Sequence, residues 1–132
     1  MQEQSIFTRI INGEIPCHKI YEDDQVIAIL TNHPIIDGHT LVIPKKQVDQ
    51  IWDLEQDDYN YLWGVSQKVA LRLRTVLNVE RVGVVIKGNE VPHIHIHLIP
   101  MPRATRVDFD PTPPPQIADD DNLEAVAVRL RF

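Results

Sequence analysis

One stretch of this sequence alternates strictly between histidine and aliphatic residues. It reads Val91-Pro92-His93-Ile94-His95-Ile96-His97-Leu98-Ile99-Pro100. Neighbouring side chains of a β-strand point to opposite faces of the sheet, so the pattern predicts a strand over 93–99 with three imidazoles on one face. The aliphatic residues between them would anchor the other face in a core. The chain must therefore build a sheet whose accessible surface carries three histidines.

Hydrophobic periodicity and turn residues predict the elements around this strand. Ser5 caps a short helix over 6–12, which Gly13 ends. Apolar, β-branched runs predict strands over 26–31, 40–43 and 82–86. A capping box of Asp53 and Gln56 starts a helix of about 20 residues that ends at Asn78. The order of helix, strands, long helix and strands predicts an α+β fold with a mostly antiparallel sheet.

The chain changes character after Pro100. Five prolines between 102 and 115 prevent regular structure and favour an extended path. A second capping box, of Asp121 and Glu124, then precedes an apolar stripe at helical period, which predicts a C-terminal helix. We expect one catalytic domain over 4–104, followed by a proline-rich tail and helix over 105–132.

Composition excludes several classes of function. The chain has 132 residues and a formal net charge of −6, with no basic run longer than the pair Lys45-Lys46. Long DNA or RNA is therefore not an expected partner. No stretch approaches the roughly 20 apolar residues of a membrane span, and no signal peptide is visible. The single cysteine, Cys17, is expected to be a small apolar residue, and the protein is expected to be cytoplasmic.

The three alternating histidines have three possible interpretations. A structural role is disfavoured because each imidazole on the face costs desolvation and needs partners. A zinc site is possible because imidazole is a common ligand, although no acidic residue lies on that face. Catalysis is favoured, since a neutral imidazole can attack phosphorus while its neighbours bind the phosphate oxygens. His18 and His33, which lie in predicted loops, are expected at the surface.

Four blocks of the sequence resemble the histidine-triad (HIT) superfamily of nucleotide hydrolases and transferases, in particular its Hint-like branch. The resemblance covers residues 5–101. The blocks are Ile6-Phe7-Thr8-Arg9-Ile10-Ile11-Asn12-Gly13-Glu14-Ile15-Pro16, Tyr21-Glu22-Asp23-Asp24, Gly38-His39-Thr40-Leu41-Val42-Ile43-Pro44-Lys45-Lys46 and the triad strand.

The resemblance implies a five-stranded antiparallel sheet with helices packed on it, assembled as a homodimer through the long helix. It implies that His95 is the nucleophile and that His97 contacts the α-phosphate. His93 and His39 would support them in an imidazole network. The apolar slot for the base would be formed by Ile6, Phe7, Ile10 and Ile29. Phe7 has an alternative role as a core aromatic residue under the first helix.

The sequence departs from the family pattern in three places. Ser5, Thr8 and Gln47 stand where many bacterial relatives have zinc ligands, so we expect no metal and no other cofactor. Thr31 stands where an acidic residue usually binds the ribose hydroxyls. The loop before the triad is short, and Asn89 is its only candidate for the asparagine that assists the phosphate.

These features together predict a hydrolase of nucleoside 5′-phosphate conjugates, of the phosphoramidate or acyl-adenylate type. The reaction would release a purine nucleoside monophosphate from a nucleotidyl-His95 intermediate. Two alternatives remain open. The chain could hydrolyse dinucleoside polyphosphates, or it could be a nucleotide-binding regulatory module with negligible turnover.

Overall fold

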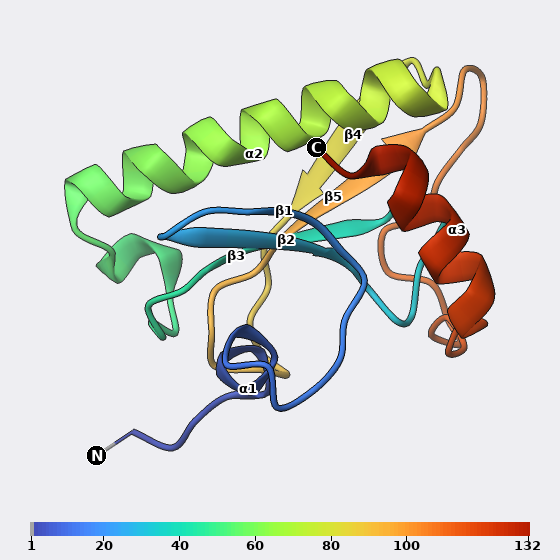
Figure 1. Cartoon of the computed structure of the whole chain (residues 1–132). Coiled ribbons are helices and arrows are strands. Elements are labelled where there is room, and N and C mark those ends of the chain that lie inside the picture. The colour runs from blue at the N-terminus through green and yellow to red at the C-terminus, as the bar shows by residue number, and fades with distance from the viewer. Residues whose placement is uncertain (1) are drawn as a thin grey trace.

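The antiparallel sheet of this protein is covered by helices on both faces (Figure 1). The computed structural model describes residues 2–132. Within that range lie helices α1 (Ile6–Ile11), α2 (Gln56–Leu77) and α3 (Asp120–Leu130), a short 3-10 helix η1 (Ile51–Asp53), and strands β1 (Lys19–Glu22), β2 (Val26–Leu30), β3 (Thr40–Pro44), β4 (Arg81–Val85) and β5 (Ile96–Met101).

The strand order in residues 2–132 is β1-β2-β3-β5-β4, and every neighbouring pair is antiparallel. This confirms the predicted α+β fold with a five-stranded antiparallel sheet. The pairing register places His97 of β5 opposite Leu41 of β3 on one side and Val85 of β4 on the other. His97 is therefore held between two strands.

Sequence periodicity did not reveal β1. The strand lies at the edge of the sheet, and Ile20 is its one fully buried residue. A single buried side chain among four gives no alternation to detect, so the strand is defined by its pairing with β2.

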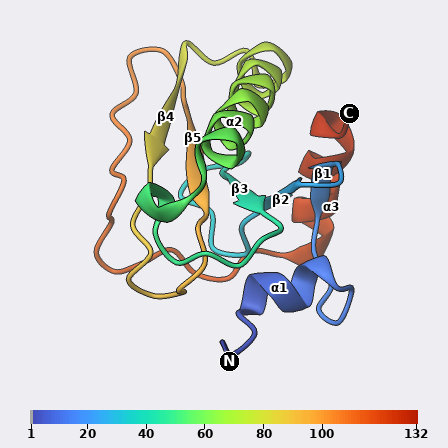
Figure 2. The same ribbon diagram turned by 90° about the vertical axis from the view of Figure 1, so that its left-hand side faces the viewer.

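Two apolar clusters hold the layers together. On one face, α2 packs Leu62, Val65, Val69 and Leu73 against alternate residues of β2, β3 and β5. On the opposite face, α1 places Phe7 over a smaller cluster that includes Ile29 and Leu41. Figure 2 shows α2 and α1 at opposite ends of this layered arrangement.

The helix starts differ in part from the predictions. Ser5 caps α1 as expected, and its hydroxyl accepts a hydrogen bond from the Thr8 amide. The capping box predicted at Asp53 is wrong, because Asp53 belongs to η1 and Glu55 is the N-cap of α2. The cap of α3 is Asp119 rather than Asp121. Helix α2 thus begins after the predicted cap, and helix α3 begins before it.

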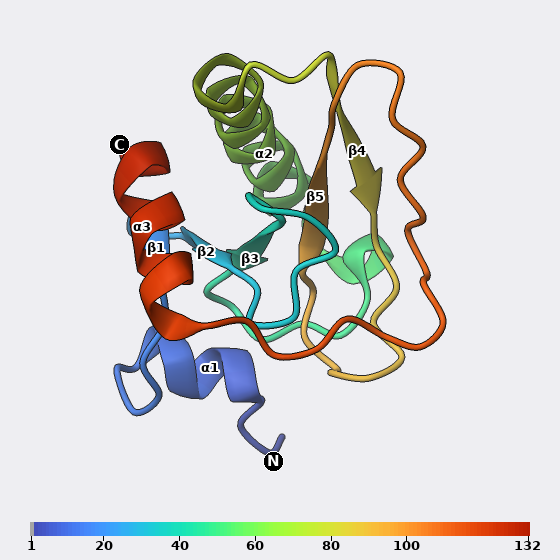
Figure 3. The same cartoon turned by 90° about the vertical axis from the view of Figure 1, so that its right-hand side faces the viewer.

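The C-terminal segment returns to the body of the protein. Residues 102–119 contain no helix or strand, and Figure 3 shows them passing outside β4 before reaching α3. The helix then buries Leu123, Val126, Ala127 and Leu130 in the same cluster as α2. The division into a domain over 4–104 and a tail over 105–132 stays a prediction.

His18 is one residue whose environment differs from the expectation. It was predicted at the surface, but its ring is half buried against α3. Nε2 lies 2.6 Å from Asp120 and Nδ1 lies 3.0 Å from Glu124. These two carboxylates arrive from over a hundred residues away, so no local pattern could have placed them there. His33 is exposed, as expected.

Among residues 2–132, none of the helices combines the length and apolar character that crossing a bilayer requires.

Candidate active site

The three triad histidines lie on the face of the sheet that α1 covers. Their rings contact Phe7 of α1 or one another, with centroids 4.8 Å apart for Phe7–His95 and 5.0 Å apart for His95–His97. The interleaved aliphatic residues Ile94, Ile96 and Leu98 are all buried on the α2 face. The predicted separation of faces is confirmed.

The predicted strand over 93–99 is wrong at its start. Strand β5 begins at Ile96, and His93 and His95 belong to an extended segment that precedes it. The ladder of β5 with β3 extends from Leu98 to Ile96. The two histidines before Ile96 are held by the hydrogen bonds of their rings and by the bond from the Ile94 amide to the Val48 carbonyl.

His93 is completely buried and both of its ring nitrogens are bonded. Nε2 donates to the carbonyl of Pro44 at 2.7 Å, because a carbonyl can only accept. Nδ1 then accepts from the Ser5 hydroxyl at 2.6 Å. Thr8 and Gln47 complete the cluster through a 2.6 Å hydrogen bond between their side chains. His93 therefore ties the N-terminal cap to the end of β3.

This cluster occupies the positions at which relatives were expected to bind zinc. Its members besides His93 are two hydroxyls and an amide, which are poor zinc ligands. Within residues 2–132, no group of three or more His, Cys, Asp or Glu side chains is arranged to hold a metal ion. Hydrogen bonds of these side chains connect the start of α1 to the end of β3, which a bound metal could also do.

His95 is 8% exposed, and its tautomer follows from its neighbour. Nδ1 lies 2.8 Å from the carbonyl oxygen of His93, so Nδ1 carries the proton and donates. The Nε2 atom consequently keeps its lone pair. Burial lowers the pKa of the imidazole, which keeps the ring neutral and nucleophilic at pH 7.

His39 and His97 form a relay of hydrogen bonds, and a backbone amide determines which of the two rings donates to the other. The amide of Ile35 donates to His39 Nδ1 at 3.1 Å, so the proton of His39 is on Nε2. That proton is donated to His97 Nδ1 at 2.9 Å. His97 therefore carries its own proton on Nε2. Burial lowers the pKa of His39 to about 4 and that of His97 to about 3, so both rings are neutral.

His39 reaches this position because the turn before β3 packs tightly. Gly38 has φ +93, a conformation that residues with a side chain rarely adopt. A Cβ there would lie 2.5 Å from Leu77 Cδ1 of α2. The turn can therefore approach α2 closely, and the next residue enters the site.

A pocket of about 520 Å³ opens over these histidines. Its wall includes His39, His95 and His97, with Phe7 and Leu41 from the α1 side. The prolines and Phe109 of the C-terminal segment form another part of the wall. A lone pair on His95 Nε2 and a proton on His97 Nε2 thus lie beside one cavity.

The structure places only some of the predicted nucleotide-binding residues at the wall of this pocket. Phe7 and Thr31 line the pocket, and Phe7 also belongs to the core beneath α1. Ile29 is buried in that core, Ile10 packs against it, and Ile6 is 47% exposed. Contact of these three residues with a base stays a prediction.

Lys87 was missed in the sequence analysis. It lines the pocket beside His95 and His97, and its charge is one of the causes that lower the pKa of His97. The sequence feature that could have identified it is a single cation shortly after β4, the strand that pairs with the triad strand β5. It is the lysine of the pocket wall and can contact a phosphate.

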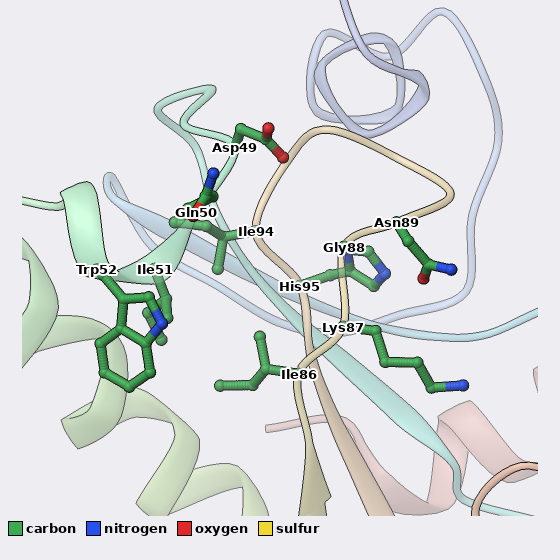
Figure 4. A pocket seen from close by; sticks show the side chains of 10 residues that line it. All are labelled: Asp49, Gln50, Ile51, Trp52, Ile86, Lys87, Gly88, Asn89, Ile94 and His95. Atoms are coloured by element: carbon green, nitrogen blue, oxygen red, sulfur yellow. The ribbon is translucent and has the colours of Figure 1, made fainter.

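Asn89 lies on a second, smaller pocket of about 300 Å³ next to His95 (Figure 4). Figure 4 shows Trp52 of η1 across this pocket from Lys87 and Asn89. Trp52 is 78% exposed and was also not singled out from the sequence. Asn89 is exposed, and its assistance to a phosphate stays a prediction.

Known proteins resemble this chain in sequence and in structure. A model of the HIT domain matches residues 12–104. An uncharacterized HIT-like protein of Methanocaldococcus jannaschii is 39% identical over 72% of this chain and 77% of its own. Adenylylsulfatase HINT3 of Arabidopsis thaliana is 32% identical over 76% of this chain and 53% of its own.

Among solved structures, a Hit-like protein involved in cell-cycle regulation from Bartonella henselae superposes with a TM-score of 0.86 at 29% identity. The superposition covers 99% of this chain and 97% of the other. The five-stranded antiparallel sheet agrees with these matches. The chain belongs to the HIT domain family, within the histidine-triad superfamily.

Proposed function

We propose that this protein hydrolyses nucleoside 5′-phosphate conjugates at the α-phosphorus and releases a purine nucleoside monophosphate. The observation that carries the proposal is the pair of tautomers in the pocket. His95 offers a lone pair on Nε2 while its neighbour His97 offers a proton on Nε2. A nucleophile and a donor for a phosphate oxygen are the two groups that the first step needs.

In the first step, Nε2 of His95 forms a bond to phosphorus, and the bond from phosphorus to the leaving group breaks. The leaving group departs with the bonding electron pair. The His95 ring becomes cationic because Nδ1 keeps its proton. The carbonyl of His93, 2.8 Å from Nδ1, stabilises that charge. The relay from His39 holds the His97 proton toward the phosphate oxygens.

In the second step, a water molecule attacks the phosphorus of the nucleotidyl-His95 intermediate. The nitrogen–phosphorus bond breaks with its electron pair returning to Nε2, the attacking water gives one proton to the solvent, and the ring returns to its neutral form. The lowered pKa of His95 favours this return, since burial disfavours the charged ring.

The name of the Arabidopsis relative, adenylylsulfatase, supports a substrate with an adenylyl group and a small leaving group. The pocket is consistent with a nucleoside, because Phe7 and Leu41 supply an apolar wall. Thr31 is half buried at the same wall, where its hydroxyl accepts from the His33 amide at 3.2 Å. The hydroxyl proton stays available to a ribose oxygen.

A fluorogenic adenosine phosphoramidate tests the proposal directly. The wild-type protein should release the amine and adenosine monophosphate, and rapid quenching should trap a chain heavier by one nucleotidyl group. Tight binding of adenosine monophosphate without turnover would instead favour the regulatory module. Exclusive cleavage of dinucleoside polyphosphates would favour the other alternative.

We further propose that the protein is a homodimer with twofold symmetry, located in the cytoplasm. Tyr59 and Trp63 of α2, the long helix that the resemblance implies at the dimer interface, pack against each other and against the core. The support now comes from Leu71 on α2 and Val84 on β4, which are 45% and 46% exposed. β4 is also the last strand of the sheet. Light scattering that shows a monomer at micromolar concentration would contradict the dimer.

A further inference from the structure

The segment between β5 and α3 forms a strap, residues 105–118, that is fastened at both ends. Near one end, the ring of Phe109 lies where a side chain of Gly83 would be, because a Cβ built at Gly83 would overlap it. Near the other end, His33 Nδ1 donates to the carbonyl of Pro115 at 3.2 Å. The Ala118 amide donates to the carbonyl of Asn32 at 2.8 Å.

Fastened in this way, the strap brings Asp110 to the wall of the pocket that contains His95 and His97. The Asp110 amide donates to the side chain of Asp108 at 2.9 Å, which shapes the turn at this point. Asp110 Oδ1 lies 3.2 Å from Nζ of Lys87. The carboxylate is therefore beside the cation that is available to a phosphate.

The charged side chains of the pocket wall do not favour additional anions. They comprise one cation, Lys87, and two carboxylates, Glu90 and Asp110. Lys87 is already paired with Asp110, and the neighbouring imidazoles of His39 and His97 are neutral. A leaving group that carries several phosphates would bring more negative charge to this wall. A phosphoramidate nitrogen takes up a proton from solvent before its bond to phosphorus breaks, and a nearby carboxylate stabilises the positive charge that this nitrogen carries until the neutral amine leaves.

We propose that Asp110 is a specificity-determining residue, whose charge disfavours polyphosphate leaving groups relative to amines. The inference rests on the proposed function, since it concerns the group that leaves the same phosphorus. The α1 wall, with Phe7 and Leu41, is assigned to the nucleoside. The wall made by Lys87 and the strap then receives the part of the substrate beyond the phosphorus.

The test compares Asp110→Asn with wild type in the full chain. Asparagine keeps the shape of the side chain, and the hydrogen bond from the 110 amide to Asp108 does not involve the altered group. The matched control is Asp121→Asn, which removes one charge from the exposed first turn of α3. The substrates are an adenosine phosphoramidate of an aliphatic amine and diadenosine tetraphosphate.

Asp110→Asn should raise the kcat/KM for the tetraphosphate relative to the phosphoramidate by about three- to ten-fold, the effect of one charge acting through water at a pocket rim. The ratio should return toward the wild-type value in about 1 M salt, which screens charges beyond about 3 Å. The control should leave the ratio unchanged. An unchanged ratio in Asp110→Asn, or an equal change in the control, overturns the proposal.

Binding separates this proposal from the proposed function. The dissociation constants of adenosine monophosphate and adenosine triphosphate, measured by calorimetry, need no turnover. Asp110→Asn should tighten the triphosphate more than the monophosphate. A shifted binding ratio with no hydrolysis by wild type contradicts the proposed function alone. Hydrolysis by wild type with unshifted ratios contradicts the role of Asp110 alone.

Discussion

His93 and the pair His95–His97 belong to one alternating run, but they have opposite surroundings. His93 is completely buried, and both of its ring nitrogens are bonded to protein atoms. The hydrogen bonds that fix His95 and His97 within residues 2–132 engage Nδ1 of each ring, and both rings line the pocket. One histidine connects parts of the fold, whereas the other two have a nitrogen available for chemistry.

The comparison shows that the residue type does not determine the role of a histidine. A ring nitrogen bonded to a carbonyl donates, and one bonded to a hydroxyl or amide proton accepts. The number of nitrogens left over then decides whether the ring can act on a substrate.

The largest effect is expected for His95→Ala. Loss of the nucleophile should lower kcat by about 10³-fold or more and abolish the trapped adduct. The variant should stay folded, but its stability should fall slightly because the ring packs against Phe7. Steady-state kinetics and intact mass spectrometry measure the two outcomes. Near-normal hydrolysis by the variant would assign the nucleophile to another group.

His97→Ala should lower kcat by about 10²–10³-fold, since the nucleophile remains but a donor to the phosphate oxygens is lost. His39→Ala should have a smaller effect of the same kind, through the orientation of His97. The double variant should be no worse than His97→Ala, because His39 acts through that ring. If the losses of kcat in the two single variants add in the double variant, His39 does not act through His97.

His93→Ala should act mainly on stability. Removal of a buried ring deletes its hydrogen bonds to the Pro44 carbonyl and to the proton of the Ser5 hydroxyl, at a cost of about 2–3 kcal/mol. Urea unfolding measures this change. Ser5→Ala, which removes the α1 cap and the same contact, should cost about 1 kcal/mol. A large loss of kcat with unchanged stability would place His93 in the chemistry instead.

Acidification should destabilise the protein through His39 and His97. Burial lowers their folded pKa values to about 4 and about 3 from an ordinary value of 6.5, so the unfolded chain binds more protons in this range. The stability gained from neutral rings is present above 6.5 and is lost as the pH falls toward 4. Unfolding at about pH 5.5 should require about 2–3 kcal/mol less than at pH 7, since each of the two rings contributes about 1 kcal/mol over this range. A free energy of unfolding that does not change between pH 5.5 and pH 7, in wild type and in His39→Ala alike, would contradict the burial of neutral rings.

The smallest effect is expected from metal removal. A chelator should leave Tm unchanged, because hydrogen bonds among Ser5, Thr8, Gln47 and His93 connect this part of the fold. The triple variant with Ser5→Cys, Thr8→Cys and Gln47→His should instead bind zinc and become sensitive to the chelator. About one zinc per wild-type chain by elemental analysis would refute the prediction.

Much of the fold could be predicted from the sequence. The apolar stripe of α2 and the alternation around the triad identified the main elements and their buried faces. The N-cap of α1 also followed from residue type, and the predicted end of the long helix at Asn78 coincides with the C-cap of α2. These features are local, because a period or a cap depends on residues a few positions apart.

The contents of the site could be predicted only in part. The sequence indicated His39, His93, His95 and His97 as a group, with Phe7 and Thr31 nearby, and the structure brings these residues together. It did not indicate Lys87, Asp110 or Trp52. Lone polar or aromatic residues in loops have no periodic pattern, and their partners lie far away in the chain.

The sequence by itself determined that three imidazoles would share one side of a sheet, since strand geometry follows from alternation. Only the tertiary structure decided which ring nitrogens of His93, His39 and His97 are engaged by the protein. That depends on the Pro44 carbonyl, the Ile35 amide and the Ser5 hydroxyl, which arrive from other elements. It also decided that the carboxylate of Asp110 lies at the pocket wall, because the neighbouring Phe109 packs against Gly83 of β4.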